Sequence, residues 1–234
     1  MAGQKSEFMQ GVFSAGAPIL AAAPFGALFG ALAVDNGMTV FEATLMSAIV
    51  FAGASQMVGI ELFGQQIAPW LIVFSIFAVN FRHVLYSAVT GRRMRDFQPW
   101  QRYVAFHFLV DPHFAESEKR AESGKPITFA WFMGGGLTWW TLWIFVTFLG
   151  ALFGGLIENP EQYGVDMLLP IYFLSLVLAF RKRANWLPVV AASAIVSILA
   201  FHFIGSPWHV SLGGLSGVLV AAILGLPNDH RMVV

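Results

Sequence analysis

The longest uncharged stretch of this chain runs from Ile127 to Ile157, 31 residues without a single Asp, Glu, Lys or Arg. A helix of about 20 apolar residues is already long enough to cross the hydrocarbon core of a bilayer. Comparable apolar stretches recur along the 234 residues, and only 11% of the residues are charged, whereas soluble domains carry about 25%. The sequence therefore predicts an all-α fold, a polytopic helix bundle embedded in a lipid bilayer.

Composition and motifs exclude several functions. The formal net charge is zero, which leaves no electrostatic footprint for nucleic-acid binding. The chain has no cysteine, so disulfides, thiol nucleophiles and thiolate metal sites are excluded. The sequence contains no phosphate-binding loop, and the chain therefore cannot drive transport by hydrolysing ATP itself. We expect no cofactor and no metal ion.

Seven membrane spans are predicted, and together they form one transmembrane domain over residues 1–234. They cover residues 11–34, 40–60, 69–89, 127–157, 166–180, 184–204 and 207–226. Pro18 and Pro24 interrupt the first span, and a proline inside a helix removes a backbone hydrogen bond. Two interpretations are open: a discontinuous helix of the kind that lines transporter cavities, or an ordinary kinked helix.

The second predicted span begins with a helix-start signature and contains a run of small residues. Thr39 precedes Glu42 by three residues, which is the spacing of a capping box. The small residues 53–55 then precede Gln56, and small side chains allow neighbouring helices to approach closely. The buried amide of Gln56 needs a polar partner, which is either another helix or a bound ligand.

Lysine and arginine cluster in two loops, and such clusters mark the cytoplasmic side. Seven of the 13 basic residues lie between Arg92 and Lys125, and three lie at 181–183. Residues 92–126 are therefore expected to form a cytoplasmic loop or amphipathic linker, with 103–117 as an amphipathic or partly re-entrant helix. With seven spans, the N-terminus is expected outside and the C-terminus in the cytoplasm.

A short sequence repeat predicts two structural halves. Gly26–Gly30 reads Gly-Ala-Leu-Phe-Gly and recurs at Gly150–Gly154, an offset of 124 residues. In the predicted topology these two helices run in opposite directions, as in the 3+3 inverted-topology repeats of transporters. The proposed halves are residues 11–91 and 127–204, with 207–226 appended. The alternative is coincidence, since glycine, alanine, leucine and phenylalanine dominate the composition.

Three polar side chains stand close together in the third predicted span, namely Asn80, Arg82 and His83. An ionisable group at membrane depth is costly and by default marks a functional site. The arginine fork fits a carboxylate bidentately, and histidine can carry a proton near neutral pH. Tyr86 belongs to the same cluster, which is expected opposite Ser55. The alternative is that Arg82 lies near the cytoplasmic end of the span and extends towards the lipid headgroups.

A second polar cluster lies in the linker, where Asp111 stands between His107 and His113. Their spacing matches no strong metal signature. The alternative to a metal site is that Asp111 forms an ion pair with Arg82 or with an arginine of the loop. An intramembrane enzyme would have to be built from these three linker residues.

Three stretches of the chain resemble signature sequences of the AzlC family of branched-chain amino acid exporters. They are Pro24-Phe25-Gly26 with Phe29-Gly30, Phe51-Ala52-Gly53-Ala54-Ser55-Gln56, and Asn80-Phe81-Arg82-His83-Val84-Leu85-Tyr86-Ser87. Their order, their approximate spacing and the hydropathy of nearly the whole chain are similar to the family pattern. The sequence departs from that pattern at Asp111-Pro112, where an acidic pair is expected, and at Met57, where an aromatic residue is common.

The resemblance implies the large subunit of a two-component secondary transporter in the bacterial inner membrane. Its partner is then a small AzlD-type membrane protein, and it exports valine, leucine, isoleucine or analogues with the proton gradient. The candidate substrate-binding residues are Asn80, Arg82, Ser55, Gln56 and Tyr86. The proton-coupling candidates are His83 and Asp111. Two other classes stay open: an intramembrane enzyme, and a channel or structural subunit of a membrane complex.

Overall fold

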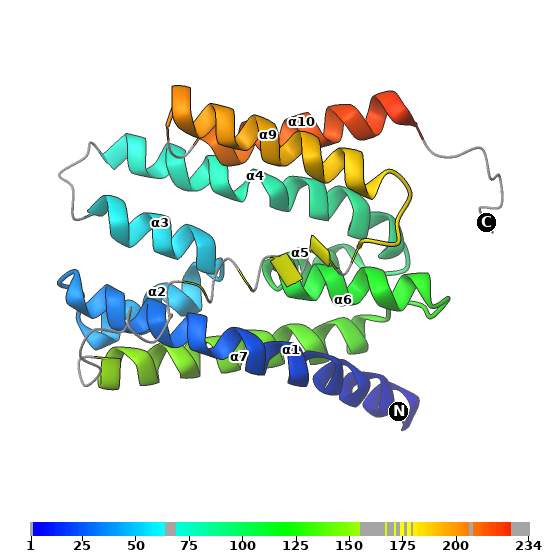
Figure 1. The fold of residues 1–234 in the computed structure, drawn as a ribbon. Coiled ribbons are helices and arrows are strands. Elements are labelled where there is room, and N and C mark those ends of the chain that lie inside the picture. Colours follow the sequence, from blue (N-terminus) through cyan, green and yellow to red (C-terminus); the bar gives the residue numbers. More distant parts are fainter. Residues whose placement is uncertain are drawn as a thin grey trace.

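The computed structural model describes residues 2–63, 69–154, 167, 171, 174–175, 177–178, 180–205 and 208–225 (Figure 1). In this part of the chain the elements are all helices, which confirms the predicted all-α bundle. They are α1 (Ala2–Asp35), α2 (Val40–Ile49), α3 (Gly53–Phe63), α4 (Pro69–Arg93), α5 (Pro99–His107), α6 (Asp111–Glu122), α7 (Phe129–Phe153), α9 (Trp186–Phe203) and α10 (Trp208–Leu224). Four of them hold stretches long and apolar enough to cross a membrane: Pro18–Asp35, Ile72–Arg93, Phe129–Phe153 and Trp186–Phe203.

The first helix, α1, continues through both of its prolines. Pro18 and Pro24 each lack the backbone N–H that would bond to the carbonyl four residues before. The helix nevertheless extends from Ala2 to Asp35. Of the two expectations for this span, the structure therefore supports one proline-containing helix and contradicts a discontinuous one.

Helices α1 and α7 pack against each other along most of their length, and glycines set their close approach (Figure 1). A Cβ atom at Gly11 would collide with the carbonyl oxygen of Trp131, and one at Gly150 with the carbonyl oxygen of Ala27. Residue numbers thus rise together along the contact, so the two helices run parallel. The two Gly-Ala-Leu-Phe-Gly segments lie side by side in the same direction, and the prediction that they run in opposite directions is wrong.

Residues 40–63 form a re-entrant hairpin instead of the predicted second span. Helix α2 starts at the end of the bundle where α1 finishes, the chain turns at 50–52, and α3 returns to that same end (Figure 1). Gln56 of α3 consequently reaches back to Ser47 of α2, with 2.8 Å between Nε2 and Oγ. One straight helix would hold these two residues about 13 Å apart along its axis.

The predicted capping box begins α2. The hydroxyl of Thr39 accepts a hydrogen bond from the N–H of Glu42, and the N–H of Thr39 donates to the Glu42 carboxylate at 2.7 Å. The pKa of Glu42 is lowered mainly by the hydrogen bond from the backbone N–H of Thr39. The hydrogen bond with the Thr39 hydroxyl lowers it further. The helix that follows has only 10 residues, half of what a membrane crossing requires.

A second re-entrant segment approaches from the opposite end of the bundle. Helix α5 starts beside the first residue of α7, where the rings of Trp100 and Phe129 lie 5.4 Å apart. The following connection reaches the middle of α7, where Phe108 meets Trp140. Helix α6 then leads back towards the start of α7. The segment 103–117, expected as an amphipathic or partly re-entrant helix, thus reaches the centre of the bundle.

The N-terminal end of α1 lies against the linker of residues 92–126. Arg120 approaches the carboxylate of Glu7 to 2.6 Å, and the hydroxyl of Thr128 donates to the same carboxylate. The expectation that the N-terminus and the linker lie on opposite sides is therefore wrong. The physical reason is the hairpin at 40–63, which adds no membrane crossing.

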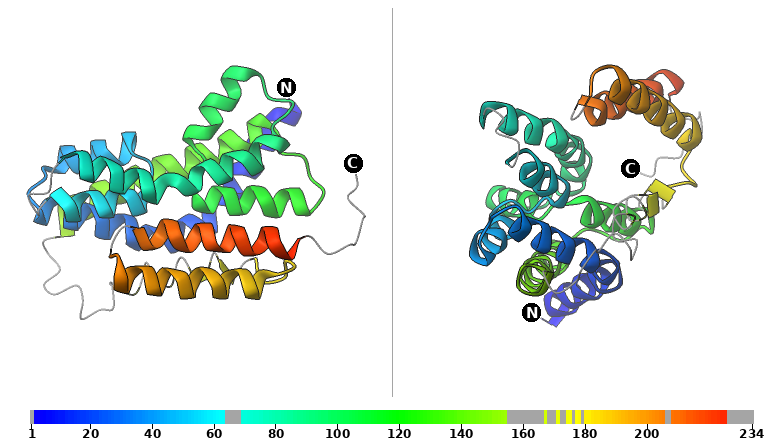
Figure 2. Two further views of the ribbon diagram at one scale, coloured as in Figure 1. Left: turned by 90° about the horizontal axis from the view of Figure 1, so that it is seen from above. Right: turned by 60° about the vertical axis from the view of Figure 1, so that its left-hand side comes forward.

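Helices α9 and α10 form an antiparallel pair, and α10 packs on α4, away from α1 and α7 (Figure 2). The side chain of Asn185 donates to the carbonyl oxygen of Gly225, so the start of α9 lies beside the end of α10. Arg183 approaches Glu122 of α6 to 2.7 Å. The described C-terminal end therefore lies at the linker end of the bundle. Most of the predicted span 166–180 lies outside the described residues.

Candidate functional site

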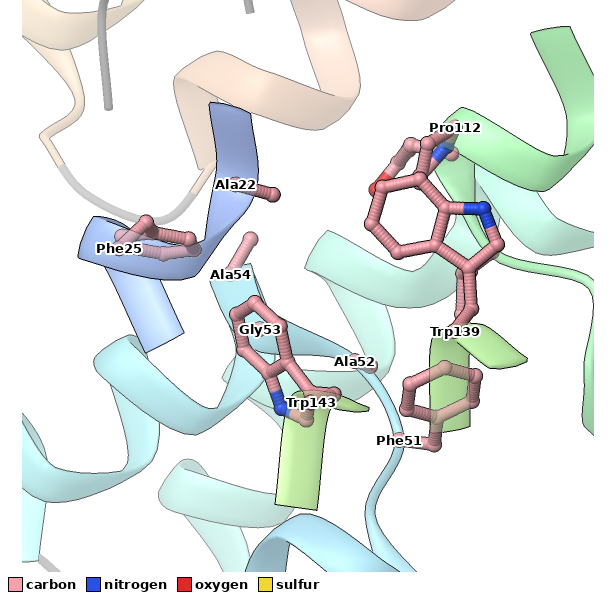
Figure 3. Close-up of a pocket in the computed structure, with 11 residues that line it drawn as sticks. Ala22, Phe25, Phe51, Ala52, Gly53, Ala54, Pro112, Trp139 and Trp143 are labelled. Carbon is pink, nitrogen blue, oxygen red and sulfur yellow. The ribbon is translucent and has the colours of Figure 1, made fainter. Parts of the chain in front are cut away.

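The two re-entrant tips meet beside the middle of α7 and enclose a pocket (Figure 3). Residues 51–54 of the first tip and 110–112 of the second line this central pocket, together with Phe25 of α1 and Trp139 and Trp143 of α7. The rings of Phe25 and Trp143 lie 5.6 Å apart. Aromatic rings and small residues form most of the lining, which suits an apolar ligand group.

The first turn of α3 begins in the lining of the central pocket. The first four N–H groups of a helix have no partner within it. In α3, the N–H groups of Ser55 and Gln56 both bond to the carbonyl oxygen of Ala52, at 2.9 and 3.0 Å. Gly53 and Ala54 line the pocket ahead of them. The positive end of the α3 dipole therefore lies at the pocket, and such an end favours a carboxylate.

Arg82 and Asp111 form an ion pair between α4 and α6. The Nε atom of Arg82 lies 3.1 Å from Oδ1 of Asp111, and Tyr86 donates its hydroxyl to the same oxygen at 2.8 Å. Tyr86 is itself stacked on Phe114, with 4.3 Å between the ring centroids. Arg82 sits midway along α4, so the guanidinium meets a carboxylate at mid-depth rather than extending from a helix end.

Asn80 connects α4 to the first re-entrant tip. Its Oδ1 atom accepts a hydrogen bond of 2.6 Å from the hydroxyl of Ser55, and its carbonyl oxygen lies 3.2 Å from Nδ1 of His83. Asn80 and His83 line a second groove, formed with residues 49–52, the last two residues of α5 and Leu109 in the connection to α6. The predicted polar cluster is therefore real, but Asp111 faces the central pocket whereas Asn80 and His83 face the groove.

Gln56 is fully buried and belongs to a hydrogen-bond network between the hairpin and α7. Its Nε2 atom donates to Ser47 at 2.8 Å, and its Oε1 atom accepts from the indole N–H of Trp143 at 3.0 Å. The Ser47 oxygen lies 2.9 Å from the hydroxyl of Thr147. Two other helices, α2 and α7, thus supply the polar partners that the Gln56 amide needs.

The network and the pocket contain α7 residues that the sequence did not single out. Trp139, Trp143 and Thr147 follow one another at intervals of four residues, so they lie on one face of the helix. Trp139 and Trp143 line the pocket, and Thr147 meets Ser47. This periodicity inside an uncharged helix is the signal that could have identified them.

The three linker residues considered for a metal or an enzyme do not converge. His107 lines the groove, Asp111 pairs with Arg82, and His113 stacks on Trp131 at 5.8 Å. Within the residues that the structure describes, no group of three His, Cys, Asp or Glu side chains is arranged to hold a metal ion. Among these described residues, the three therefore share no reaction site.

Long apolar helices, two re-entrant tips and a charged cluster at mid-depth define a polytopic membrane protein whose architecture is consistent with a transporter. Comparison with known families agrees with this class. The chain belongs to the AzlC family, since the family model described as AzlC protein matches residues 18–157. The matched range contains both re-entrant tips and the Arg82–Asp111 pair, and it confirms the resemblance of the three motifs.

Relatives are found among bacterial and archaeal membrane proteins. The chain is 27% identical to the inner membrane protein YgaZ of Escherichia coli (strain K12), over 92% of this chain and 90% of that protein. It is 29% identical to an uncharacterized membrane protein of Archaeoglobus fulgidus, over 88% of each chain. It is 27% identical to an uncharacterized membrane protein of Helicobacter pylori (strain 26695), over 76% of this chain and 79% of that one. No solved structure matches the chain.

Proposed function

We propose that this chain is the large subunit of a secondary exporter of branched-chain amino acids. It acts in a bacterial inner membrane together with a small AzlD-type membrane protein. Membership of the AzlC family and similarity to a bacterial inner membrane protein along nearly the full length support the proposal. The observation that carries it is the central pocket, where a helix N-terminus and an apolar wall meet Asp111, the carboxylate that pairs with Arg82.

A zwitterionic amino acid carries the same two charges as the Arg82–Asp111 pair. It can enter between the two side chains so that Arg82 binds its carboxylate and Asp111 binds its ammonium group, and neither protein charge is left unpaired. The N-terminus of α3 at Gly53 adds favourable dipole charge for the carboxylate. On release, the ion pair forms again. A substrate that lacks either charge would leave one buried partner unsatisfied.

The branched side chain packs against the aromatic wall of the pocket, built by Phe25, Phe51 and Trp143. Tyr86 holds the Asp111 carboxylate in place, while Ser55 and Asn80 position the first tip against α4. Gln56 does not line the pocket. It positions Trp143 by accepting a hydrogen bond from the indole N–H of that residue. His83 and Asp111 are the proton carriers closest to this site.

The linker end of the bundle is the cytoplasmic end in this proposal. Lys5, the basic residues of 92–126 and residues 181–183 all gather there, in agreement with the excess of basic residues in cytoplasmic segments. Both ends of the described chain are then cytoplasmic. Helices α1 and α7, locked by glycine contacts, form the frame against which α4 and the two tips move.

Transport of labelled valine in proteoliposomes tests the proposal. The chain is reconstituted together with its small partner, and exchange of external labelled valine for internal unlabelled valine is measured. We expect exchange for valine, leucine and isoleucine, loss of exchange in Arg82→Ala, and normal exchange in Arg95→Ala, whose charge lies on the linker. Normal exchange by Arg82→Ala at normal abundance would contradict the assigned role of Arg82.

The same preparation separates a transporter from the other classes considered. A channel would conduct net flux down a gradient without the accelerating effect of internal unlabelled substrate. A purely structural subunit would bind no valine, and its partner alone would carry the flux. Either result would contradict the proposal.

A further inference from the structure

A second pair of ionisable side chains is buried in α6, between the central pocket and the linker end of the bundle. His113 is fully buried, stacked on Trp131 and in edge contact with Phe132 at 4.2 Å. Its Nδ1 atom lies 3.7 Å from Oε2 of Glu116, too far for a hydrogen bond. Among the described residues, neither ring nitrogen of His113 and neither carboxylate oxygen of Glu116 has a hydrogen-bond partner.

Burial decides how many protons this pair holds. An ionised group without hydrogen bonds in an apolar interior is strongly disfavoured unless an opposite charge compensates it. A pair with no proton would leave a bare carboxylate, and a pair with two protons would leave a bare imidazolium. One proton gives either a compensated ion pair or two neutral side chains. His113 and Glu116 therefore have the chemistry of a site for a single proton.

Other charges do not neutralise this pair. Helix α7, which packs on His113, has no charged residue between Phe129 and Phe153. At this end of α1 the charged residues are Lys5 and Glu7, and Glu7 is paired with Arg120. On α6 itself, Asp111 pairs with Arg82, Glu118 is held by two arginines and Arg120 pairs with Glu7. Lys119 and Glu122 lie at exposed positions of the same helix. The proton on His113 and Glu116 is thus the local charge that can change.

The glycine run of α7 makes room for this site. A Cβ atom at Gly135 would lie 2.6 Å from Cε1 of His113, and one at Gly136 would lie 2.7 Å from Cβ of Phe108. The imidazole and the second re-entrant tip therefore occupy the volume that side chains at these positions would fill. Glycines are therefore needed at 135 and 136 because His113 of α6 and Phe108 of the second tip pack against this part of α7.

We propose that His113 and Glu116 form a second proton-binding site, on the linker side of Asp111. Helix α6 runs from Asp111 at the central pocket towards the linker end of the bundle, so the pair lies between the proposed substrate site and the cytoplasmic end. The role in coupling rests on the proposed export function, whereas the binding of a proton does not. The pair releases its proton towards the cytoplasm and takes up in exchange a proton that leaves the central cluster.

Tryptophan fluorescence tests proton binding without any transport. A protonated imidazole quenches an indole ring that it stacks on, and His113 stacks on Trp131. In the purified full-length chain we expect a quenching step as the pH falls. The step should be absent from His113→Gln and from Trp131→Phe, and shifted in pH in the isosteric Glu116→Gln. His202→Gln, at an exposed position of α9, is the matched control. Identical titrations of wild type and His113→Gln would overturn the inference.

Proteoliposomes test the coupling role. Exchange of valine at equal pH on both sides should persist in Glu116→Gln, whereas the acceleration by an imposed proton gradient should be lost. Retained acceleration in this variant would overturn the coupling role. Absence of valine exchange in the wild type would instead contradict the proposed function, and the fluorescence titration would still decide whether the pair binds a proton.

Discussion

The hydroxyl of Ser55 lies 2.6 Å from Oδ1 of Asn80, so the first re-entrant tip is fixed to the middle of α4. Two residues further along α4, Arg82 pairs with Asp111 at the start of α6. One short segment of a single helix therefore holds both tips. Any displacement of α4 would therefore act on the two tips together, as the proposed transport requires.

The Arg82–Asp111 pair should show strong energetic coupling. Breaking a fully buried ion pair costs about 3–5 kcal/mol, and this pair is partly exposed, so Asp111→Asn should cost about 2 kcal/mol of unfolding free energy. Combining it with Arg82→Gln should cost less than the sum of the two single changes, because no charge is then left unpaired. Thermal unfolding of the four proteins in detergent measures this. Additive effects would show that the two side chains do not interact.

Glycine contacts should make the α1–α7 interface sensitive to one methyl group. A Cβ atom at Gly30 would collide with the backbone of Thr147, so Gly30→Ala should destabilise the protein by about 1–3 kcal/mol. Gly16 lies in the same helix, and a Cβ atom there meets nothing within 4 Å. Gly16→Ala should therefore be neutral or slightly stabilising. Equal stabilities of the two variants would contradict the close backbone contact of α1 with α7 at Gly30.

The Gln56 network should matter for stability as well as for transport. Replacing Gln56 by leucine leaves the indole N–H of Trp143 without its partner, at a cost of about 1–3 kcal/mol, and it removes one of the two hydrogen bonds of Ser47, which keeps Thr147. We expect a lower unfolding temperature and weaker valine exchange. Gln10→Leu, at an exposed position of α1, is the control and should leave both unchanged. An unaltered unfolding temperature in Gln56→Leu would contradict the network.

Element types and several boundaries were predictable from the sequence, because apolar runs and capping signals act locally. Thr39 and Glu42 begin α2 where the capping box predicts it, and Pro69 begins α4. The polar cluster at Asn80 and Arg82 was predictable because a polar or charged side chain inside a membrane span is energetically costly and by default marks a functional site. The pairing of Arg82 with Asp111 was one of the alternatives considered, and the structure confirms it.

The hairpin at 40–63 was not predictable from hydropathy, because two half-helices in series have the same length and polarity as one span. Its break at 50–52 contains no proline, whereas the prolines of α1 interrupt nothing. Because the hairpin does not cross the membrane, the structure has one crossing fewer than predicted at this point. The N-terminus therefore lies at the linker end of the bundle. The direction expected for the repeat at offset 124 was also wrong, because α1 and α7 run parallel and the two segments pack against each other.

Labelling of single cysteines tests the re-entrant hairpin most directly, because the chain contains no cysteine of its own. Asn36 precedes the hairpin and Trp70 follows it, while Lys5 and Lys125 lie at the linker end. Each is replaced by cysteine and labelled in intact cells with a reagent that does not cross membranes. We predict that positions 36 and 70 are labelled from one side of the membrane and positions 5 and 125 from the other. Labelling of positions 36 and 70 from opposite sides would show that residues 40–63 span the membrane, and it would contradict a central pocket formed by two re-entrant tips.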